Sequence, residues 1–466
     1  MKFKLPILVL KVLHYLQKGG FQAYVVGGAV RDILMGKPTY DWDFTTDATP
    51  AQILEIFPDG FYDNKFGTVG VAVKDLLAKY DLDKKDLSGI QENLPFEITT
   101  FRSESEYKDS RHPDKVQWGK TIEEDLKRRD FTSNAIALDK NIKIVDPFGG
   151  QEDIQKKLIR AVGDPDTRFS EDALRMMRAI RLSAELGFTI EENTLKAISK
   201  NWQLLNKISF ERIRDEFLKI LKSPFPADGI KLLFTSNLLG VILPELIATH
   251  DIVQAGHHTK DVWNHSLDSL ATCPSPDPIV RLATLLHDIG KPLAFRKKDD
   301  KITFYGHEVV GERVARKIAD RLKLSGKDKE KLLILIRYHM FVYNPEMSDA
   351  AIRRFIRKVG KENINDMIML RIGDRLGGGS RATSWRLREF QERIGKVLYT
   401  PMQINDLKVD GRDVMKILGI KPGPEVGRIL QKLFEEVLED SQKNQREYLL
   451  NRIKFFSSIL NIIPDN

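Results

Sequence analysis

The chain has 466 residues, of which 42% are hydrophobic and 30% charged, and 74 Lys and Arg against 66 Asp and Glu give it a net charge of +8. This composition is typical of a folded globular protein and excludes a wholly disordered chain. No run of about 18 apolar residues is present, so no membrane-spanning helix is expected. The excess of basic residues favours a polyanionic partner such as a nucleic acid, with a solvated basic surface as the alternative.

The N-terminal residues MKFKLPILVLKVLHYLQKGG predict an amphipathic helix. Lys11 interrupts the apolar run and no small-residue cleavage site follows, which argues against a signal peptide. The one cysteine of the sequence, Cys273, excludes a disulfide framework and a thiolate zinc cage. The expected compartment is therefore the cytoplasm.

The pattern of predicted elements changes near residue 150. Before it, short β-branched runs bounded by turns alternate with helical stretches and predict strands in AYVVGG, GTVGVAV, PFEITTF, SNAIAL and IKIVDPFGG. After it, helical spacing dominates, as in SFERIRDEFLKILK, apart from a possible hairpin arm at KITFYG. We therefore predict an α+β fold with a mixed N-terminal domain followed by helical domains, with boundaries at 1–150, 151–245, 246–398 and 399–466.

A phosphate-binding turn is one interpretation of Gly27 and Gly28, which lie between a predicted strand and a helix that carries Arg31. Glycines at such a turn let backbone N–H groups approach an anion, and the start of a helix favours negative charge. The alternative is a simple turn.

Asp41 and Asp43 flank Trp42 in DWDFTT, which we interpret as a strand. Alternation along a strand would place both carboxylates on one face, where they repel each other unless a cation neutralises them. Mg²⁺ suits such a pair, and Glu97 in PFEITTFR is expected to complete the site. Ions held there would activate a hydroxyl and stabilise leaving pyrophosphate. The alternative is an acidic pair that caps a turn.

Six motifs follow one another in the first 220 residues: GGAVRD, DWDFTT, EITTFR, RRDFTSNAIA, DPFGG and EDALRMMRAIRL. In this order they resemble the bacterial-type (class II) tRNA nucleotidyltransferases, or CCA-adding enzymes, and the related poly(A) polymerases. The resemblance implies a polymerase-β-like head that adds C, A or both to tRNA 3′ ends from CTP and ATP with Mg²⁺. It implies that Asp41 and Asp43 bind the metal and that Glu97 is the third catalytic carboxylate. The implied nucleotide-binding residues are Gly27, Gly28, Arg31, Arg128, Arg129, Asp130, Asn134, Asp172, Arg175, Arg178 and Arg181.

The resemblance assigns base selection to Asp172 and Arg175. Three positions apart, they are expected to share one helix face, where an acceptor and a donor can pair with the Watson–Crick edge of C or A. The alternative is an ordinary salt bridge between them. Arg178 and Arg181 continue that face. Asp130 resembles a residue that bonds the ribose hydroxyls.

Two further segments belong to the resemblance. Glu211 and Arg212 in SFERIRDEF are expected to brace the nucleotide-selecting helix. The loop 103–119 resembles a loop that helps the family switch from C to A addition, which favours CCA or A addition over CC addition alone.

Several of the nine histidines fall in a second ordered pattern, with His287 and Asp288 in HDIGKP at its centre. The pattern resembles the HD superfamily of metal-dependent phosphohydrolases. The resemblance implies that His265, His287, Asp288 and Asp374 bind a transition metal, with His307 and His339 at a second metal or the substrate and Lys291 at phosphate. A metal-bound hydroxide would then hydrolyse phosphoesters at tRNA 3′ ends. A scaffold that only binds tRNA is the alternative.

The segment GIKPGPEVG predicts a helix that begins near Glu425, in a stretch resembling the tail of bacterial CCA-adding enzymes. Lys421 and Arg428 are expected to hold tRNA phosphates there, with a purely packing role as the alternative. We predict a CCA-adding tRNA nucleotidyltransferase. The rival interpretations are a poly(A) polymerase, which the absence of a basic low-complexity extension disfavours, an HD phosphodiesterase with an idle head, and a non-catalytic RNA-binding protein.

Overall fold

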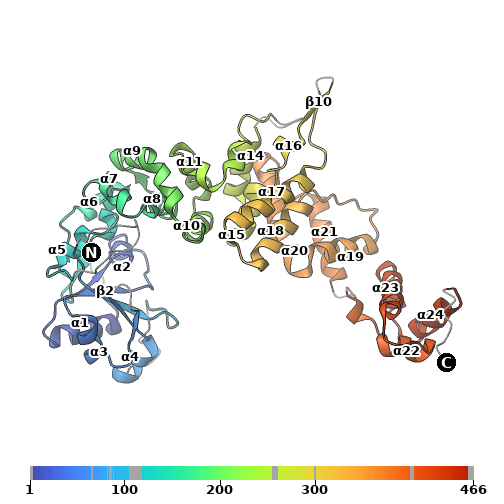
Figure 1. Ribbon diagram of the computed structural model, residues 1–466, viewed down its shortest axis with the longest axis horizontal. Coiled ribbons are helices and arrows are strands. Elements are labelled where there is room, and N and C mark those ends of the chain that lie inside the picture. Colours follow the sequence, from blue (N-terminus) through green and yellow to red (C-terminus); the bar gives the residue numbers. More distant parts are fainter. Residues whose placement is uncertain are drawn as a thin grey trace. The chain divides into compact units, whose positions relative to one another are not determined.

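The computed structural model describes residues 4–63, 67–80, 82, 87, 89–103, 118–253, 261–298, 301–398 and 403–459. The chain divides into two compact units, Met1–Pro244 and Glu245–Asn466 (Figure 1). The finer division into four domains remains a prediction. Among the described helices, none combines the length and apolar character needed to cross a membrane.

A seven-stranded mixed sheet forms the centre of the first unit, in the order β3-β4-β5-β2-β1-β6-β7. Strands β2 and β5 are parallel and the other pairs are antiparallel. The predicted α+β class is thus confirmed. The strands are β1 Ala23–Val26, β2 Asp43–Thr46, β3 Phe61–Asp63, β4 Thr68–Val71, β5 Phe96–Thr100, β6 Ala137–Leu138 and β7 Ile144–Val145.

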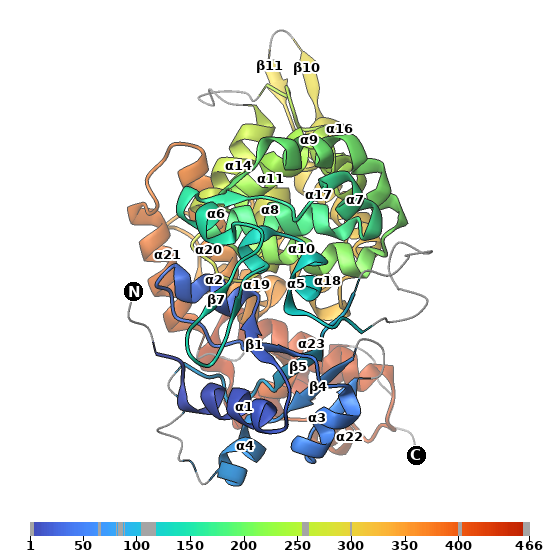
Figure 2. The same ribbon diagram turned by 90° about the vertical axis from the view of Figure 1, so that its left-hand side faces the viewer.

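One face of this sheet packs against α1 (Ile7–Lys18), α3 (Pro50–Ile56) and α4 (Val73–Tyr80), as Figure 2 shows for α1 and α3. Helix α1 is the predicted amphipathic helix, and it buries five apolar side chains, Leu8, Val9, Val12, Leu13 and Leu16. The strands contribute Val25, Phe44, Val69 and Ile98 to the same core. Because side chains alternate along a strand, Asp43, Glu97 and Phe61 project from the other face.

The remaining elements of the first unit are mostly helical. SNAIAL is only partly a strand, because Thr132–Asn134 forms a short 3-10 helix (η2) before β6. Strand β3 and the two-residue strands β8 (Leu158–Ile159) and β9 (Thr189–Ile190) were not predicted. The helices are α2 Gly28–Leu34, α5 Ile122–Lys127, α6 Gly150–Lys156, α7 Pro165–Glu171, α8 Leu174–Leu186, α9 Glu192–Asn201, η3 Trp202–Lys207, α10 Phe210–Lys222, α11 Pro226–Thr235, α12 Leu239–Ile242 and α13 Pro244–Ile247.

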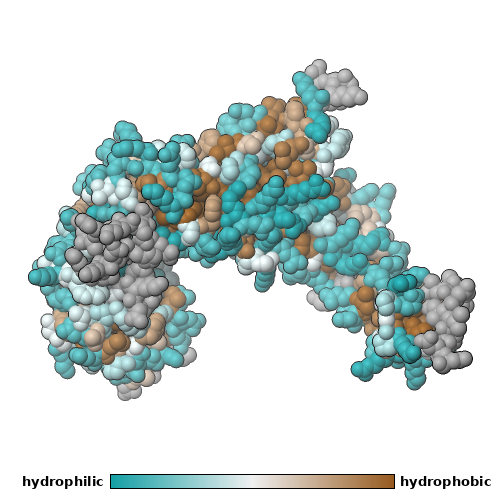
Figure 3. Space-filling model, in the orientation of Figure 1, coloured by the Kyte–Doolittle hydropathy of each residue, from teal (hydrophilic) through white to brown (hydrophobic). Residues whose placement is uncertain are grey.

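Among the described residues of the second unit, the named strands are the two of the β10–β11 hairpin (Arg296–Lys298 and Lys301–Thr303), which confirms the predicted arm (Figure 2). Hydrophilic residues cover much of α17 and α18 on the face shown in Figure 3. The helices are α14 Val262–Thr272, α15 Pro278–Leu286, α16 Lys291–Ala294, α17 His307–Arg321, α18 Gly326–Tyr338, α19 Asp349–Val359, η4 Lys361–Asn363, α20 Ile364–Gly377, α21 Trp385–Val397, η5 Ile404–Asp406, α22 Gly411–Leu418, α23 Pro424–Glu439, η6 Ser441–Lys443 and α24 Arg446–Ile459.

The last helices form a small core of their own that includes Ile429, Leu433 and Leu449. The predicted helix near Glu425 is confirmed as α23. The buried Arg353 of α19 donates hydrogen bonds to the carbonyl oxygens of Leu438 and Glu439 at 2.7 and 3.0 Å. These carbonyls at the end of α23 have no partner within the helix, so Arg353 both caps α23 and joins the tail to α19.

Candidate active site and metal centre

Two carboxylates meet where β2 and β5 run side by side. Asp43 is the register partner of Glu97 in this parallel pair, so both side chains project from the same face of the sheet. Asp41 precedes β2, so the expectation that both aspartates lie on one strand is wrong. The two aspartates are nevertheless close neighbours: burial and the charge of Asp41 raise the pKa of Asp43 to about 6, Glu97 adds to this effect, and Arg129 opposes it. Such crowded anions fit a divalent cation.

Gly27 forms the turn between β1 and α2 with a φ of 75°, a backbone conformation that favours glycine. A Cβ at this position would lie 3.3 Å from Nη1 of Arg129 and 3.4 Å from Oδ2 of Asp43. The glycine therefore leaves open the space between a cation and a carboxylate of the site. Gly28 begins α2.

Asp125 organises the two arginines of the RRD motif, and sequence analysis missed it. Its side chain is fully buried. It accepts hydrogen bonds from Arg128 Nε at 3.1 Å and from Arg129 Nη2 at 3.2 Å. In TIEEDLKRR the three residues have the i, i+3 and i, i+4 spacing of helical ion pairs, a signal that could have identified the aspartate. Arg128 and Arg129 are thus held fixed, and Arg129 reaches Gly27.

Arg31 connects α2 to the segment after the RRD motif. Its Nη1 donates to Oδ1 of Asn134 at 2.9 Å, and its Nη2 donates to Oδ1 of Asp32 at 2.8 Å. Two residues expected to bind the nucleotide therefore contact each other, although they are 103 positions apart.

The base-selecting pair is arranged differently from the expectation. Asp172 lies in the break between α7 and α8, in an extended conformation, so it does not share a helix with Arg175. Its Oδ1 accepts from the backbone N–H of Leu174 at 3.0 Å, and its Oδ2 accepts from Arg212 Nη2 at 2.7 Å. Arg175 pairs with Glu171 instead of Asp172. The contact from α10 to Asp172 agrees with the bracing role expected of Arg212.

Arg178 and Arg181 do lie on α8 with Arg175, as predicted. Arg178 Nε donates to Oδ2 of the buried Asp130 at 2.7 Å. Burial alone would raise the pKa of Asp130, but the charges of Arg178 and Arg175 outweigh it and lower the pKa below its usual value. Asp130 is therefore an anion held in place by α8. Arg181 lies 3.2 Å from Glu216 of α10. The expected switching loop falls mostly on residues 104–117, outside the described residues.

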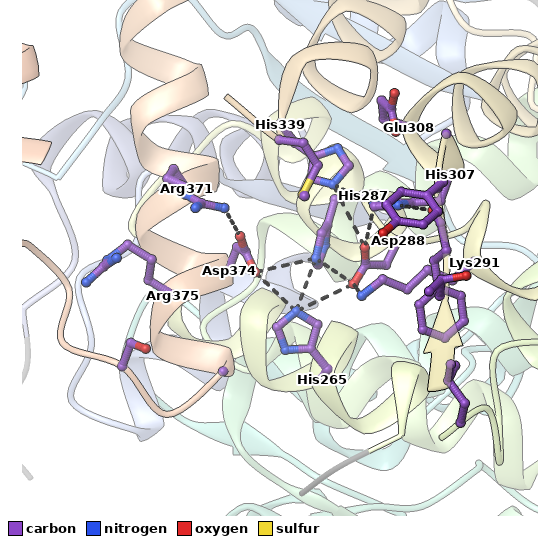
Figure 4. A pocket seen from close by; sticks show the side chains of 18 residues that line it. His265, His287, Asp288, Lys291, His307, Glu308, His339, Arg371, Asp374 and Arg375 are labelled. Carbon is purple, nitrogen blue, oxygen red and sulfur yellow. Dashed lines mark hydrogen bonds and ion pairs between the residues drawn. The ribbon is translucent and has the colours of Figure 1, made fainter. Parts of the chain in front are cut away.

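The histidine–aspartate pattern converges in the second unit from α14, the end of α15, α17, the end of α18 and α20 (Figure 4). His265 Nε2 lies 3.2 Å from both His287 Nε2 and Asp374 Oδ1, and His287 Nε2 lies 3.2 Å from Asp288 Oδ2. All four residues expected to bind the metal are thus brought together. His265, His287 and Asp288 are each at most 2% exposed.

A second group shares Asp288. Its other oxygen, Oδ1, lies 3.3 Å from His307 Nε2, which is itself 3.3 Å from His339 Nε2. The Nδ1 atoms of His307 and His339 are 2.9 and 2.7 Å from the backbone carbonyls of Phe304 and Ile336. Because a carbonyl only accepts, Nδ1 of each ring carries a proton, and Nε2 of each ring is directed at the cluster. Burial, reinforced by His287, lowers the pKa of His339 to about 3, which keeps this ring neutral.

Imidazole nitrogens that converge on a buried carboxylate could hold a cation. Burial would lower the pKa of His287, but the charges of Asp288 and Asp374 raise it above its usual value, so its surroundings also favour positive charge. Imidazole nitrogens and carboxylate oxygens together suit first-row divalent metals. Lys291 Nζ lies 2.6 Å from Asp288 Oδ2, and Arg371 Nη1 lies 2.7 Å from Asp374 Oδ2. These two cations border a cavity of about 740 Å³ that opens onto the cluster, a volume suited to a small organic ligand.

Comparison with known proteins assigns the chain to one family. Residues 23–160 match the family model of the poly(A) polymerase head domain, residues 187–249 match the model described as "Probable RNA and SrmB-binding site of polymerase A", and residues 307–453 match that of tRNA nucleotidyltransferase domain 2. The chain is 33% identical to the A-adding tRNA nucleotidyltransferase of Deinococcus radiodurans over 89% of its own length and 91% of that protein. The chain belongs to the tRNA nucleotidyltransferase family.

Other tRNA nucleotidyltransferases match over different shares of their length. The CCA-adding enzyme of Geobacillus thermodenitrificans is 46% identical over 49% of this chain, which spans about half, 52%, of that relative. A crystal structure of the Bacillus stearothermophilus CCA-adding enzyme in complex with CTP matches with a TM-score of 0.73 and 28% identity, covering 98% of this chain and 99% of that one. The match covers both units of the present structure.

Proposed function

We propose that the first unit is a template-independent tRNA nucleotidyltransferase that adds C, A or both to tRNA 3′ ends from CTP and ATP, in the cytoplasm. The observation that carries the proposal is the register pairing of Asp43 with Glu97, beside Asp41 and Arg129. CTP is bound by the similar Bacillus stearothermophilus enzyme. Transfer of this kind depends on positioning and charge stabilisation, so it needs little covalent help from the protein.

Asp41 and Asp43 are the residues that would hold Mg²⁺, which supplies positive charge to the reacting α-phosphate and to the leaving pyrophosphate. Arg129 faces Asp43 across the space that Gly27 leaves open, where it can bind the triphosphate. Arg31 is fixed by Asn134 and is the second candidate for phosphate. Asp172 and Arg175 are candidates for the base. Arg212 holds the carboxylate of Asp172 in one orientation.

Replacing Asp125 by Asn tests the positioning of the arginines. The change keeps the shape of the side chain but removes the charge that fixes Arg128 and Arg129. A hydrogen bond to a charged group contributes about 1.5–3 kcal/mol, so we expect the KM for CTP and ATP to rise by about tenfold. The KM for tRNA should change little. The exposed Glu123 lies on the same helix, and Glu123→Gln is the matched control in steady-state kinetics. Equal nucleotide KM values for D125N and the control would contradict the assignment.

Base selection on the wild-type chain tests the proposed function. A tRNA transcript that lacks CCA is incubated with Mg²⁺ and each of the four labelled nucleoside triphosphates separately, and incorporation is counted. A second transcript, ending in CC, is treated in the same way. We expect incorporation from CTP into the first transcript, from ATP into the second, or both, with none from GTP or UTP. Incorporation of all four nucleotides at similar rates, or of none into either transcript, would refute the proposal.

The cluster around Asp288 favours a second candidate function, a metal-dependent phosphohydrolase that acts on phosphoesters at tRNA 3′ ends. The carrying observation is that Asp288 joins two buried groups of ligands, one with His265 and His287 and one with His307 and His339. A metal bound there lowers the pKa of water. Lys291 and Arg371 border the cavity and can neutralise a phosphate. Two substrates test this activity with added Co²⁺ or Ni²⁺: a tRNA ending in a 3′-phosphate should release inorganic phosphate, or a tRNA ending in a 2′,3′-cyclic phosphate should be opened to a phosphomonoester. Finding neither reaction with any first-row metal would refute it.

Lys421 and Arg428 remain candidates for binding tRNA phosphates. Both are exposed, and the side chain of Arg428 is 71% exposed although its Nη1 lies 3.0 Å from Glu425. We expect the double variant K421A/R428A to bind tRNA more weakly. The slope of log affinity against log salt concentration should be smaller in magnitude by about 1.4–1.8, because two phosphate contacts are lost. Lys18→Ala, at an exposed position of α1, is the control. A slope equal to that of the wild type would assign the two residues to packing alone.

A further inference from the structure

Four residues form a straight row across the sheet of the first unit. Asp43 pairs with Glu97, Glu97 with Gly70, and Gly70 with Phe61. Neighbouring strands lie about 4.8 Å apart, and partners in register project from the same face. The row therefore starts at the carboxylates of the proposed active site and ends at an aromatic side chain on the edge strand β3.

The ring of Phe61 lies over Gly70. A Cβ on Gly70 would be 2.2 Å from Cζ of Phe61 and 2.6 Å from its Cε2, so any side chain at position 70 would displace the ring. The phenyl group thus extends across β4 in the direction of Glu97. It is nevertheless 55% exposed, because the apolar core lies on the opposite face of the sheet. An exposed ring beside an anionic site offers a stacking surface.

The two sides of Asp43 differ in chemistry. On the side of β1 lie Gly27 and Arg129, and these attract a triphosphate. On the side of β5 lie Glu97 and then Phe61, and the row itself includes no basic side chain. Arg102 reaches the same face of β4, where it donates to Oγ1 of Thr68 at 3.4 Å. The two substrates of a transfer reaction meet at the carboxylates expected to bind the metal. If the triphosphate occupies the side of β1, the RNA 3′ end must approach from the other side, over β5 and β4. RNA bases stack on exposed aromatic side chains.

We propose that Phe61 stacks against the terminal base of the RNA whose 3′-hydroxyl is extended, with Gly70 providing the space for its ring. This proposal rests on the nucleotidyl transfer proposed above. It assigns to the edge of the sheet a binding role for the primer that is separate from nucleotide selection at α8.

Steady-state kinetics with a tRNA ending in CC and with ATP test the proposal. Phe61→Ala should raise the KM for tRNA by about tenfold, since one base stack is lost, and should leave the KM for ATP unchanged. Phe61→Trp should retain the wild-type KM. Gly70→Ala should reproduce the effect of F61A, and the double variant should be no worse than F61A alone. Tyr62→Ala changes an exposed aromatic on the opposite face of β3 and is the matched control.

A binding measurement separates this proposal from the proposed function. A tRNA with 2-aminopurine as its last base should lose fluorescence on binding the wild type and F61W, and lose less on binding F61A, with no nucleotide present. Equal quenching by F61A and the wild type would overturn the stacking role, as would an unchanged KM for tRNA. A raised KM for ATP alone would instead place the incoming base on Phe61. If the wild type extends no RNA, the proposed transfer fails, and the quenching still decides the role of Phe61.

Discussion

Replacing Asp43 by Ala is expected to reduce nucleotide addition to tRNA by about 10³-fold or more. Asp43 lies at the centre of the site, paired with Glu97 and facing Arg129. Removing a metal ligand forfeits several kcal/mol of charge stabilisation in the transition state, and each 1.4 kcal/mol is a factor of ten in rate. Single-turnover rates with saturating tRNA and ATP measure the effect. The exposed Asp59 of the same unit supplies the control, Asp59→Ala.

Stability distinguishes a catalytic from a structural role of Asp43. Its pKa is raised in the folded state, so above pH 6 its ionised form costs folding free energy when no Mg²⁺ is bound. We therefore expect Asp43→Asn to melt at the same or a higher temperature than the wild type at pH 7.5 in EDTA, while it loses activity. A melting temperature several degrees lower, or activity within threefold of the wild type, would contradict the assigned role.

Replacing Asp288 by Ala is expected to remove transition metal from the second unit and to leave nucleotide addition within about twofold of the wild type. Both oxygens of Asp288 face imidazole nitrogens, so this one change depletes both ligand groups. It also leaves Lys291 without its buried partner, and breaking a buried ion pair costs about 3–5 kcal/mol. We therefore also expect a lower melting temperature in the absence of metal.

Metal analysis of the folded fraction, after dialysis against EDTA and reloading with Co²⁺ or Ni²⁺, measures this prediction. His307→Ala removes a candidate ligand and keeps the ion pair between Lys291 and Asp288, so it should lose metal with a smaller loss of stability. Glu346→Ala, at an exposed position of the same unit, is the control. Metal retained by both D288A and H307A would show that the cluster is a set of structural side chains.

The order of motifs along the chain indicated which side chains come together. Glu97 was expected to lie on a later strand and to join the aspartates, and it is the register partner of Asp43. The resemblance to the HD superfamily implied that His265, HDIGKP and Asp374 converge, and the structure brings them together. Their roles in binding nucleotide and metal remain predictions. The break at Asp172 was not predicted, because three-residue spacing on a helical stretch suggests one continuous face. Asp172 instead caps the start of α8, because its side chain accepts a hydrogen bond from the backbone N–H of Leu174. Aspartate favours such positions over helix interiors.

Tertiary neighbours account for the remaining differences. Phe61 is a surface residue of a three-residue strand, and its proposed role in stacking depends on the register that brings Gly70 beneath its ring. Asp125 is one of three acids in a charged helix, and the spacing to Arg128 and Arg129 marks it as a possible ion-pair partner, but its complete burial is visible only in the structure. Cross-strand register is not encoded in local periodicity.

The central claim is that this chain completes tRNA 3′ ends, and its most direct test uses three transcripts of one tRNA, ending before CCA, after C and after CC. Each is incubated with Mg²⁺ and with CTP, ATP or both, and the products are resolved at single-nucleotide length. Our account predicts growth that stops at CCA, or one A added to the transcript ending in CC if the chain adds A alone. Long A-tails on any RNA would assign the chain to the poly(A) polymerases, and no extension of any transcript would contradict the account.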